Sequence, residues 1–136
     1  FFYYNNIMMT LRTFENDEPV TSVMTKGVLY IDSSKTVYDA VKIMADFDIG
    51  SLLVLEKEKA VGIITTKDII RAIARDEDIK QIKVSEIMQS PVITISAFES
   101  ISSALIKMRE QKINHLVVIE KGKIIGMINP LNLLAY

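Results

Sequence analysis

The chain has 136 residues, of which 49% are hydrophobic and 24% are charged, and its formal net charge is −1 at pH 7. This balance is typical of a globular protein, and the near-neutral charge argues against a broad surface for nucleic acid. The absence of cysteine excludes disulfides and thiolate metal sites. Because no apolar run approaches the roughly 18 residues that span a bilayer, we expect a cytoplasmic protein with no membrane segment.

Residues 1–16 form an N-terminal arm outside the regular pattern of the chain. Its apolar side chains, from Phe1 to Phe14, stand close to helical spacing. This spacing predicts a helical arm that covers an exposed face of the remaining chain or, alternatively, contacts a partner.

The first regular segment begins with a predicted strand over residues 28–31, and an amphipathic helix follows it. Between Val37 and Met44, apolar side chains recur at i, i+3, i+4 and i+7, which is the spacing of one helix face. Thr36 is the predicted N-cap of this helix, and Asp39 suits its positive end.

Two short apolar runs, residues 51–55 and residues 61–65, flank a charged turn and predict a β-hairpin. A helix from about Lys67 to Arg75 then closes the unit. The order of these elements is β-α-β-β-α.

The same series of elements returns at an offset of 64 residues without a gap, so the chain is an internal duplication. Identical residues at equivalent positions include Met24 and Met88, Ala40 and Ala104, and Gly62 and Gly126. We expect an α/β (α+β) fold with a first repeat over residues 17–78 and a second over residues 79–136. A unit of about 60 residues buries only about 60% of its unfolded surface, so the repeats should fold against each other and form a cleft.

Thr65 and Asp68 stand where the last strand of the first repeat meets the helix that follows. Free backbone amides and the positive end of a helix favour an anion at such a junction. A carboxylate can accept from two adjacent ribose hydroxyls, and a threonine hydroxyl can donate to a phosphate, so the pair suits a nucleotide. The same spacing also occurs where threonine and an acid only cap a helix, and the two residues alone favour this second interpretation.

Catalytic motifs are absent from the sequence. It contains no Gly-x-Ser-x-Gly, no phosphate-binding loop, no His-Glu-x-x-His and no dinucleotide fingerprint. His115, the only histidine, has no cysteine with which to share a metal ion. We therefore expect neither an enzyme nor a metal site.

From about Pro19 to Tyr136, the duplicated sequence resembles the cystathionine-β-synthase (CBS) domain family, and specifically a tandem pair. The matching segments are residues 22–25, 62–70, 85–88, 91–95 and 113–118. The resemblance implies two repeats packed about a pseudo-twofold axis, with two clefts for adenosine-containing ligands such as AMP, ADP, ATP or S-adenosylmethionine. It also implies a regulatory module that pairs into a homodimer and needs no catalytic cofactor.

In that family, the acid of the first repeat and the entry to the central strand of the second repeat complete one cleft. The resemblance therefore implies a ligand site at Thr65 and Asp68, with Lys67 near the phosphate. The other residues expected in this cleft are Ile63, Val92, Ile93, Asn114 and His115.

The second cleft would pair Asn129 and Asn132, which replace the threonine and the acid, with residues of the first repeat. These residues are Val28, Leu29, Gly50 and Ser51. A hydrogen bond to a charged group contributes about 1.5–3 kcal/mol, against about 0.5–1.5 kcal/mol for a neutral one. The loss of the carboxylate costs about tenfold or more in affinity, so we expect this cleft to be weak or empty.

The sequence thus predicts a stand-alone sensor of an adenine nucleotide or related adenosyl ligand that acts on a regulated partner protein. The alternative is a structural interaction module whose clefts stay empty and whose N-terminal arm contacts a partner. Nucleic-acid binding is the least favoured interpretation, because the chain is nearly neutral.

Overall fold

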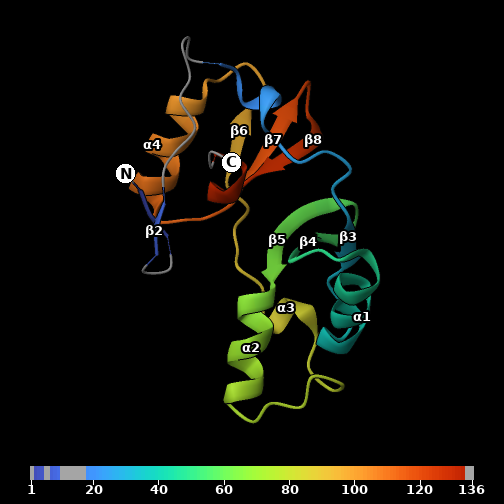
Figure 1. Ribbon diagram of the computed structural model, residues 1–136. Coiled ribbons are helices and arrows are strands. Elements are labelled where there is room, and N and C mark those ends of the chain that lie inside the picture. Colours follow the sequence, from blue (N-terminus) through green and yellow to red (C-terminus); the bar gives the residue numbers. More distant parts are fainter. Residues whose placement is uncertain (1, 5–6, 10–17, 134–136) are drawn as a thin grey trace. The chain divides into compact units, whose positions relative to one another are not determined.

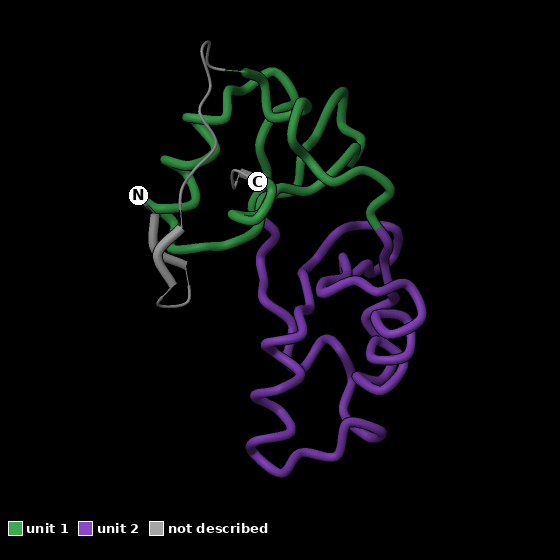
Figure 2. Tube along the Cα trace, viewed as in Figure 1, with its two compact units in different colours: residues 1–28, 93–136 green, residues 29–92 purple. Residues whose placement is uncertain are grey.

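The computed structural model describes residues 2–4, 7–9 and 18–133, and the chain divides into two compact units (Figures 1 and 2). The continuous unit comprises residues 29–92, whereas the composite unit combines residues 1–28 with residues 93–136. Each unit holds a three-stranded sheet and its own hydrophobic core. The predicted α/β (α+β) class and the duplicated β-α-β-β arrangement are confirmed.

The continuous unit follows the predicted order β-α-β-β-α and adds the short helix α3 (Val84–Ile87), which the sequence did not predict. The predicted elements are β3 (Tyr30–Asp32), α1 (Val37–Phe47), β4 (Ser51–Glu56), β5 (Lys59–Thr65) and α2 (Thr66–Ala74). The central strand β4 is parallel to β3 and antiparallel to β5. The apolar positions of the strands and of α1 form one core, in which Leu52, Val54 and Ile64 are fully buried.

The composite unit repeats this sheet. Its elements are η1 (Val20–Ser22), β6 (Thr94–Ser96), α4 (Ile101–Gln111), β7 (Leu116–Glu120), β8 (Lys123–Ile128) and η2 (Pro130–Leu133). Strand β7 is central, parallel to β6 and antiparallel to β8. The last element begins at Pro130, whose fixed φ suits a first helical position, and over the described residues it is a 3₁₀-helix.

The segment that precedes the first strand of each repeat packs in the unit of the other repeat. Val20 is fully buried in the composite core, and its amide donates to the Glu99 carbonyl at 2.9 Å. Val84 is fully buried in the continuous core, and its amide donates to the Lys35 carbonyl at 2.9 Å. The duplication seen in the sequence therefore folds with these two segments exchanged.

The N-terminal arm differs from the helix that its apolar spacing predicts. β1 (Phe2–Tyr4) and β2 (Ile7–Met9) pair in antiparallel fashion, with Tyr4 opposite Ile7. The physical reason lies in the residue types, since aromatic and β-branched residues favour strands. Residues 1, 5–6 and 10–16 of the predicted arm lie outside the described residues.

Within the described ranges, no helix is long and apolar enough to cross a lipid bilayer.

Candidate functional site

Thr65 and Asp68 meet at the N-terminus of α2, as their spacing predicts. The backbone amide of Thr65 donates to Asp68 Oδ2 at 2.8 Å, and the Thr65 hydroxyl donates to the same oxygen at 2.9 Å. The Asp68 amide returns a hydrogen bond to Thr65 Oγ1 at 3.3 Å. Both residues are only 7% exposed. This capping box therefore holds a buried carboxylate in a fixed orientation at the start of a helix.

Gln89 is a third member of this site, and sequence reasoning missed it. Its Nε2 donates to Asp68 Oδ1 at 3.1 Å and lies 3.5 Å from Oδ2. The Gln89 backbone exchanges two hydrogen bonds with Ile63 of β5, at 2.8 and 2.9 Å. No local pattern predicts this contact, because the pairing joins chain segments more than twenty residues apart.

The second repeat builds the equivalent cap without a charge. The Asn129 amide donates to Asn132 Oδ1 at 2.8 Å, in the place where Thr65 donates to Asp68. Asn132 Nδ2 donates to the Thr25 hydroxyl at 3.1 Å, and Thr25 is the residue equivalent to Gln89 at the repeat offset. The asparagine thus preserves the geometry of the cap, but it offers no carboxylate.

The predicted site residues are divided between the two units. In the continuous unit, strand pairing places Ser51 opposite Thr65, and the Gly50 carbonyl accepts from the Thr66 amide at 3.0 Å. The continuous unit also holds further predicted residues: Leu29, Ile63, Lys67 and Val92. The composite unit holds the remaining ones: Val28, Ile93, Asn114, His115, Asn129 and Asn132. Each predicted cleft therefore draws on residues of both units.

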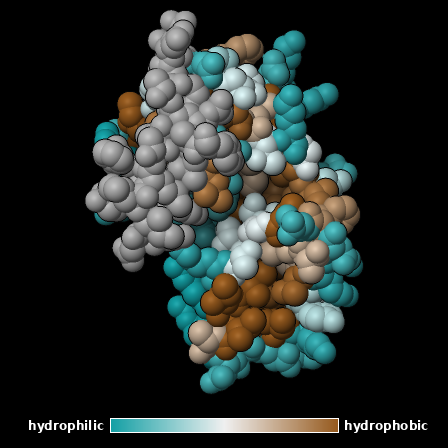
Figure 3. Space-filling model, viewed as in Figure 1, coloured by the Kyte–Doolittle hydropathy of each residue, from teal (hydrophilic) through white to brown (hydrophobic). Residues whose placement is uncertain are grey.

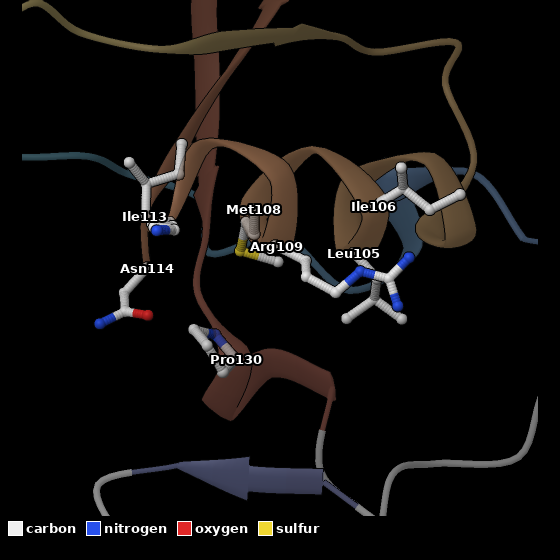
Figure 4. Close-up of a pocket in the computed structure, with 8 residues that line it drawn as sticks. Leu105, Ile106, Met108, Arg109, Ile113, Asn114 and Pro130 are labelled. Atoms are coloured by element: carbon white, nitrogen blue, oxygen red, sulfur yellow. The ribbon is translucent and has the colours of Figure 1, made fainter.

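A hollow of about 470 Å³ lies in the composite unit beside α4 (Figure 4). It is lined mainly by apolar side chains of α4, together with Ile113, Asn114 and Pro130. Asn114 is the one predicted ligand-site residue in its lining. The hollow belongs to the composite unit, whereas the Thr65 and Asp68 cap belongs to the continuous unit.

In the part of the chain that the structure describes, no group of three or more histidine, cysteine or acidic side chains lies close enough together to hold a metal ion.

Comparison with known proteins gives the family. The family model for the CBS domain matches residues 20–75 and 84–136. A homoserine O-acetyltransferase of Methanococcus vannielii is 34% identical over 122 residues, which cover 88% of this chain and 25% of that protein. The chain spans 64% and 52% of two further curated relatives, so it matches only part of each.

Solved structures agree in fold. The crystal structure of a conserved protein from Pyrococcus horikoshii has a TM-score of 0.78 at 33% identity, covering 88% of this chain and 91% of that one. The CBS domain pair of protein MJ0100, solved with 5′-methylthioadenosine and S-adenosyl-L-methionine, has a TM-score of 0.75 at 26% identity, covering 86% and 93%. Two matches to one family model, in tandem and over most of the chain, show that this protein belongs to the CBS domain family as a CBS domain pair.

Proposed function

We propose that this CBS domain pair senses an adenosine-containing ligand, such as AMP, ADP, ATP or S-adenosylmethionine. The observation that carries the proposal is the buried Asp68 carboxylate, which is held at the start of α2 by Thr65 and Gln89. The adenosyl compounds bound by the related domain pair of MJ0100 support the ligand class. In this proposal the carboxylate accepts from the ribose, and Ile63 and Lys67 of the same repeat contribute further contacts.

The site would be completed by Val92, at the end of the continuous unit, and by Ile93, Asn114 and His115 of the composite unit. The second cleft, with Val28, Leu29, Gly50, Ser51, Asn129 and Asn132, would bind weakly or not at all. Its cap supports this difference, because the only side-chain oxygen of Asn132 already accepts from the Asn129 amide. Without a carboxylate, an incoming hydroxyl meets a weaker acceptor.

We also propose that the protein is a regulatory module rather than an enzyme, that it is cytoplasmic and that it forms a homodimer. The exposed face of α2 supports a protein contact. Ile70 and Ile73 are 60% and 54% exposed there, and Figure 3 shows apolar surface gathered over this part of the continuous unit. Contiguous apolar surface of this kind marks interaction sites. The same surface favours the second candidate function, an interaction module whose clefts stay empty.

The test replaces Asp68 by asparagine, because Asn132 shows that asparagine preserves the cap in this fold. Titration calorimetry with AMP and with S-adenosylmethionine should show wild-type binding and an affinity about tenfold or more lower for Asp68→Asn, since a charged acceptor is lost. Asp46→Asn, an exposed change on α1, is the matched control and should bind as the wild type does.

A thermal-shift screen separates the two candidate functions. A ligand that binds only the folded state raises the melting temperature, by an amount equivalent to about 2.7 kcal/mol at one hundred times its Kd. No shift with AMP, ADP, ATP or S-adenosylmethionine would favour the interaction module. Equal affinity of the wild type and Asp68→Asn for the nucleotide would show that Asp68 does not contribute to binding.

A further inference from the structure

The two oxygens of the Asp68 carboxylate are unequally available to a ligand. Oδ2 accepts from the amide and the hydroxyl of Thr65, which uses both of its lone-pair directions. Oδ1 accepts from Gln89 Nε2 at 3.1 Å and retains one acceptor position. Two ribose hydroxyls therefore cannot take both carboxylate oxygens while these hydrogen bonds persist.

Gln89 supplies a second acceptor beside Oδ1. Only its NH₂ group can donate to a carboxylate, so the hydrogen bond to Asp68 fixes which end of the amide is nitrogen. The side chain is exposed, in contrast to buried Asp68, and no hydrogen bond to its Oε1 is found among residues 18–132. Its backbone is anchored to Ile63 by two hydrogen bonds.

We propose that Gln89 is a ligand-binding residue that accepts a hydrogen bond from the second hydroxyl of a ribose. One hydroxyl of the diol donates to Asp68 Oδ1, and its neighbour donates to Gln89 Oε1. This arrangement leaves the Thr65, Asp68 and Gln89 hydrogen bonds intact, so binding costs none of them. The inference rests on the proposed function and deepens it, because it names the group that distinguishes a ribose from a deoxyribose.

The second repeat gives an internal comparison in which this acceptor pair is missing. There the direction of the side-chain bond is reversed, since Asn132 Nδ2 donates to the Thr25 hydroxyl. Asn132 Oδ1 already accepts from the Asn129 backbone amide, and Thr25 has no side-chain amide oxygen. The recognition of a diol is therefore confined to the first repeat.

The experiment uses Gln89→Met, which keeps the length of the side chain and removes both polar atoms. Titration calorimetry compares AMP, 2′-deoxy-AMP and 3′-deoxy-AMP on the full chain. The wild type should prefer AMP to both deoxy analogues. In Gln89→Met, AMP should bind about two- to tenfold more weakly, and the preference over one deoxy analogue should disappear while the other preference remains. Gln81→Met, an exposed glutamine of the continuous unit outside the site, is the control and should behave as the wild type.

Three results would overturn the inference. Unchanged AMP affinity in Gln89→Met would mean that Gln89 does not contact the ligand. Tighter binding of AMP would mean that Gln89 competes with the ligand. An equal loss of affinity for all three nucleotides would mean that Gln89 only orients Asp68. If Asp68→Asn weakens AMP while Gln89→Met does not, this inference fails and the proposed function stands. If the wild type binds neither AMP nor S-adenosylmethionine, both fail.

Discussion

Gly62 allows two backbone segments to cross at a distance that no other residue permits. A Cβ at this position would lie 2.6 Å from Met88 Sδ and 2.8 Å from the Gln89 carbonyl oxygen. That carbonyl accepts from the Ile63 amide at 2.9 Å, so it cannot retreat without loss of the bridge that anchors Gln89. Gly126 meets Met24 and Thr25 in the same way. The glycines at equivalent positions of the two repeats thus mark the two segment crossings.

We predict that Gly62→Ala lowers the free energy of unfolding by about 1–3 kcal/mol, because overpacking against a fixed backbone forces a shift. Chemical denaturation measures the change. Gly50→Ala is the control, since its nearest neighbour is Thr66 Oγ1 at 3.4 Å and an added methyl group fits there with little displacement. A Gly62→Ala protein as stable as the wild type would show that the crossing relaxes freely.

Among the helices, α1 shows how the chain sets an element boundary. Thr36 Oγ1 accepts from the Asp39 amide at 3.1 Å, and Asp39 accepts from the Thr36 amide at 3.1 Å, which confirms the predicted N-cap. The backbone amide of Thr36, then its hydroxyl and then Lys42 lower the pKa of Asp39 below its usual value of 3.8. The cap is therefore stabilised by the charged form of this carboxyl.

This shift predicts an acid dependence of stability. Because the folded pKa of Asp39 is lowered, its contribution to stability is fully present above its usual pKa of 3.8 and is lost as the pH falls through the folded pKa. Asp39→Asn should be less stable than the wild type at neutral pH and should lose less stability below about pH 4. Thermal unfolding measured from about pH 3, where carboxyls become protonated, to about pH 7, where they are ionised, tests this difference in stability. Asp46→Asn is the control on the same helix. Parallel pH curves for the wild type and Asp39→Asn would contradict the assignment.

For the protein as a whole, the boundaries of the sequence repeats differ from those of the compact units, because the segment before the first strand of each repeat packs in the core of the other unit. The continuous core draws on Val84, Ile87 and Met88, which belong to the second repeat of the sequence. The composite core draws on Val20 and Val23, which belong to the first. The predicted domain boundary between residues 78 and 79 stays a prediction that fragments can test.

We predict that a fragment of residues 29–92 unfolds at a higher denaturant concentration than a fragment of residues 17–78. The first retains its whole core, whereas the second lacks Val84 and carries Val20 without a partner. At about 60 residues a domain is only marginally stable, so the loss of a few buried side chains decides whether it folds. Circular dichroism with urea compares the two, and greater stability of residues 17–78 would instead support the repeat boundary.

Residue types and their spacing were enough to predict the duplication, the α/β (α+β) class, the caps of α1 and α2, and the family. All of these depend on patterns within about twenty residues or on the comparison of one repeat with the other, and both are visible along a linear chain. The helix expected in the N-terminal arm shows the limit of this reasoning, because apolar spacing over a short segment fits a hairpin as well as a helix.

The exchange of segments, the crossing at Gly62 and the contact of Gln89 with Asp68 became apparent only from the three-dimensional fold. Each depends on backbone pairing between distant parts of the chain, such as Ile63 with Gln89. The free energy of such pairing depends on the tertiary context, so no local sequence pattern predicts it. A glutamine in the segment between α3 and β6 carries no sequence signal of its own. Folding gives it a role, because it brings the amide within 3.1 Å of a buried carboxylate.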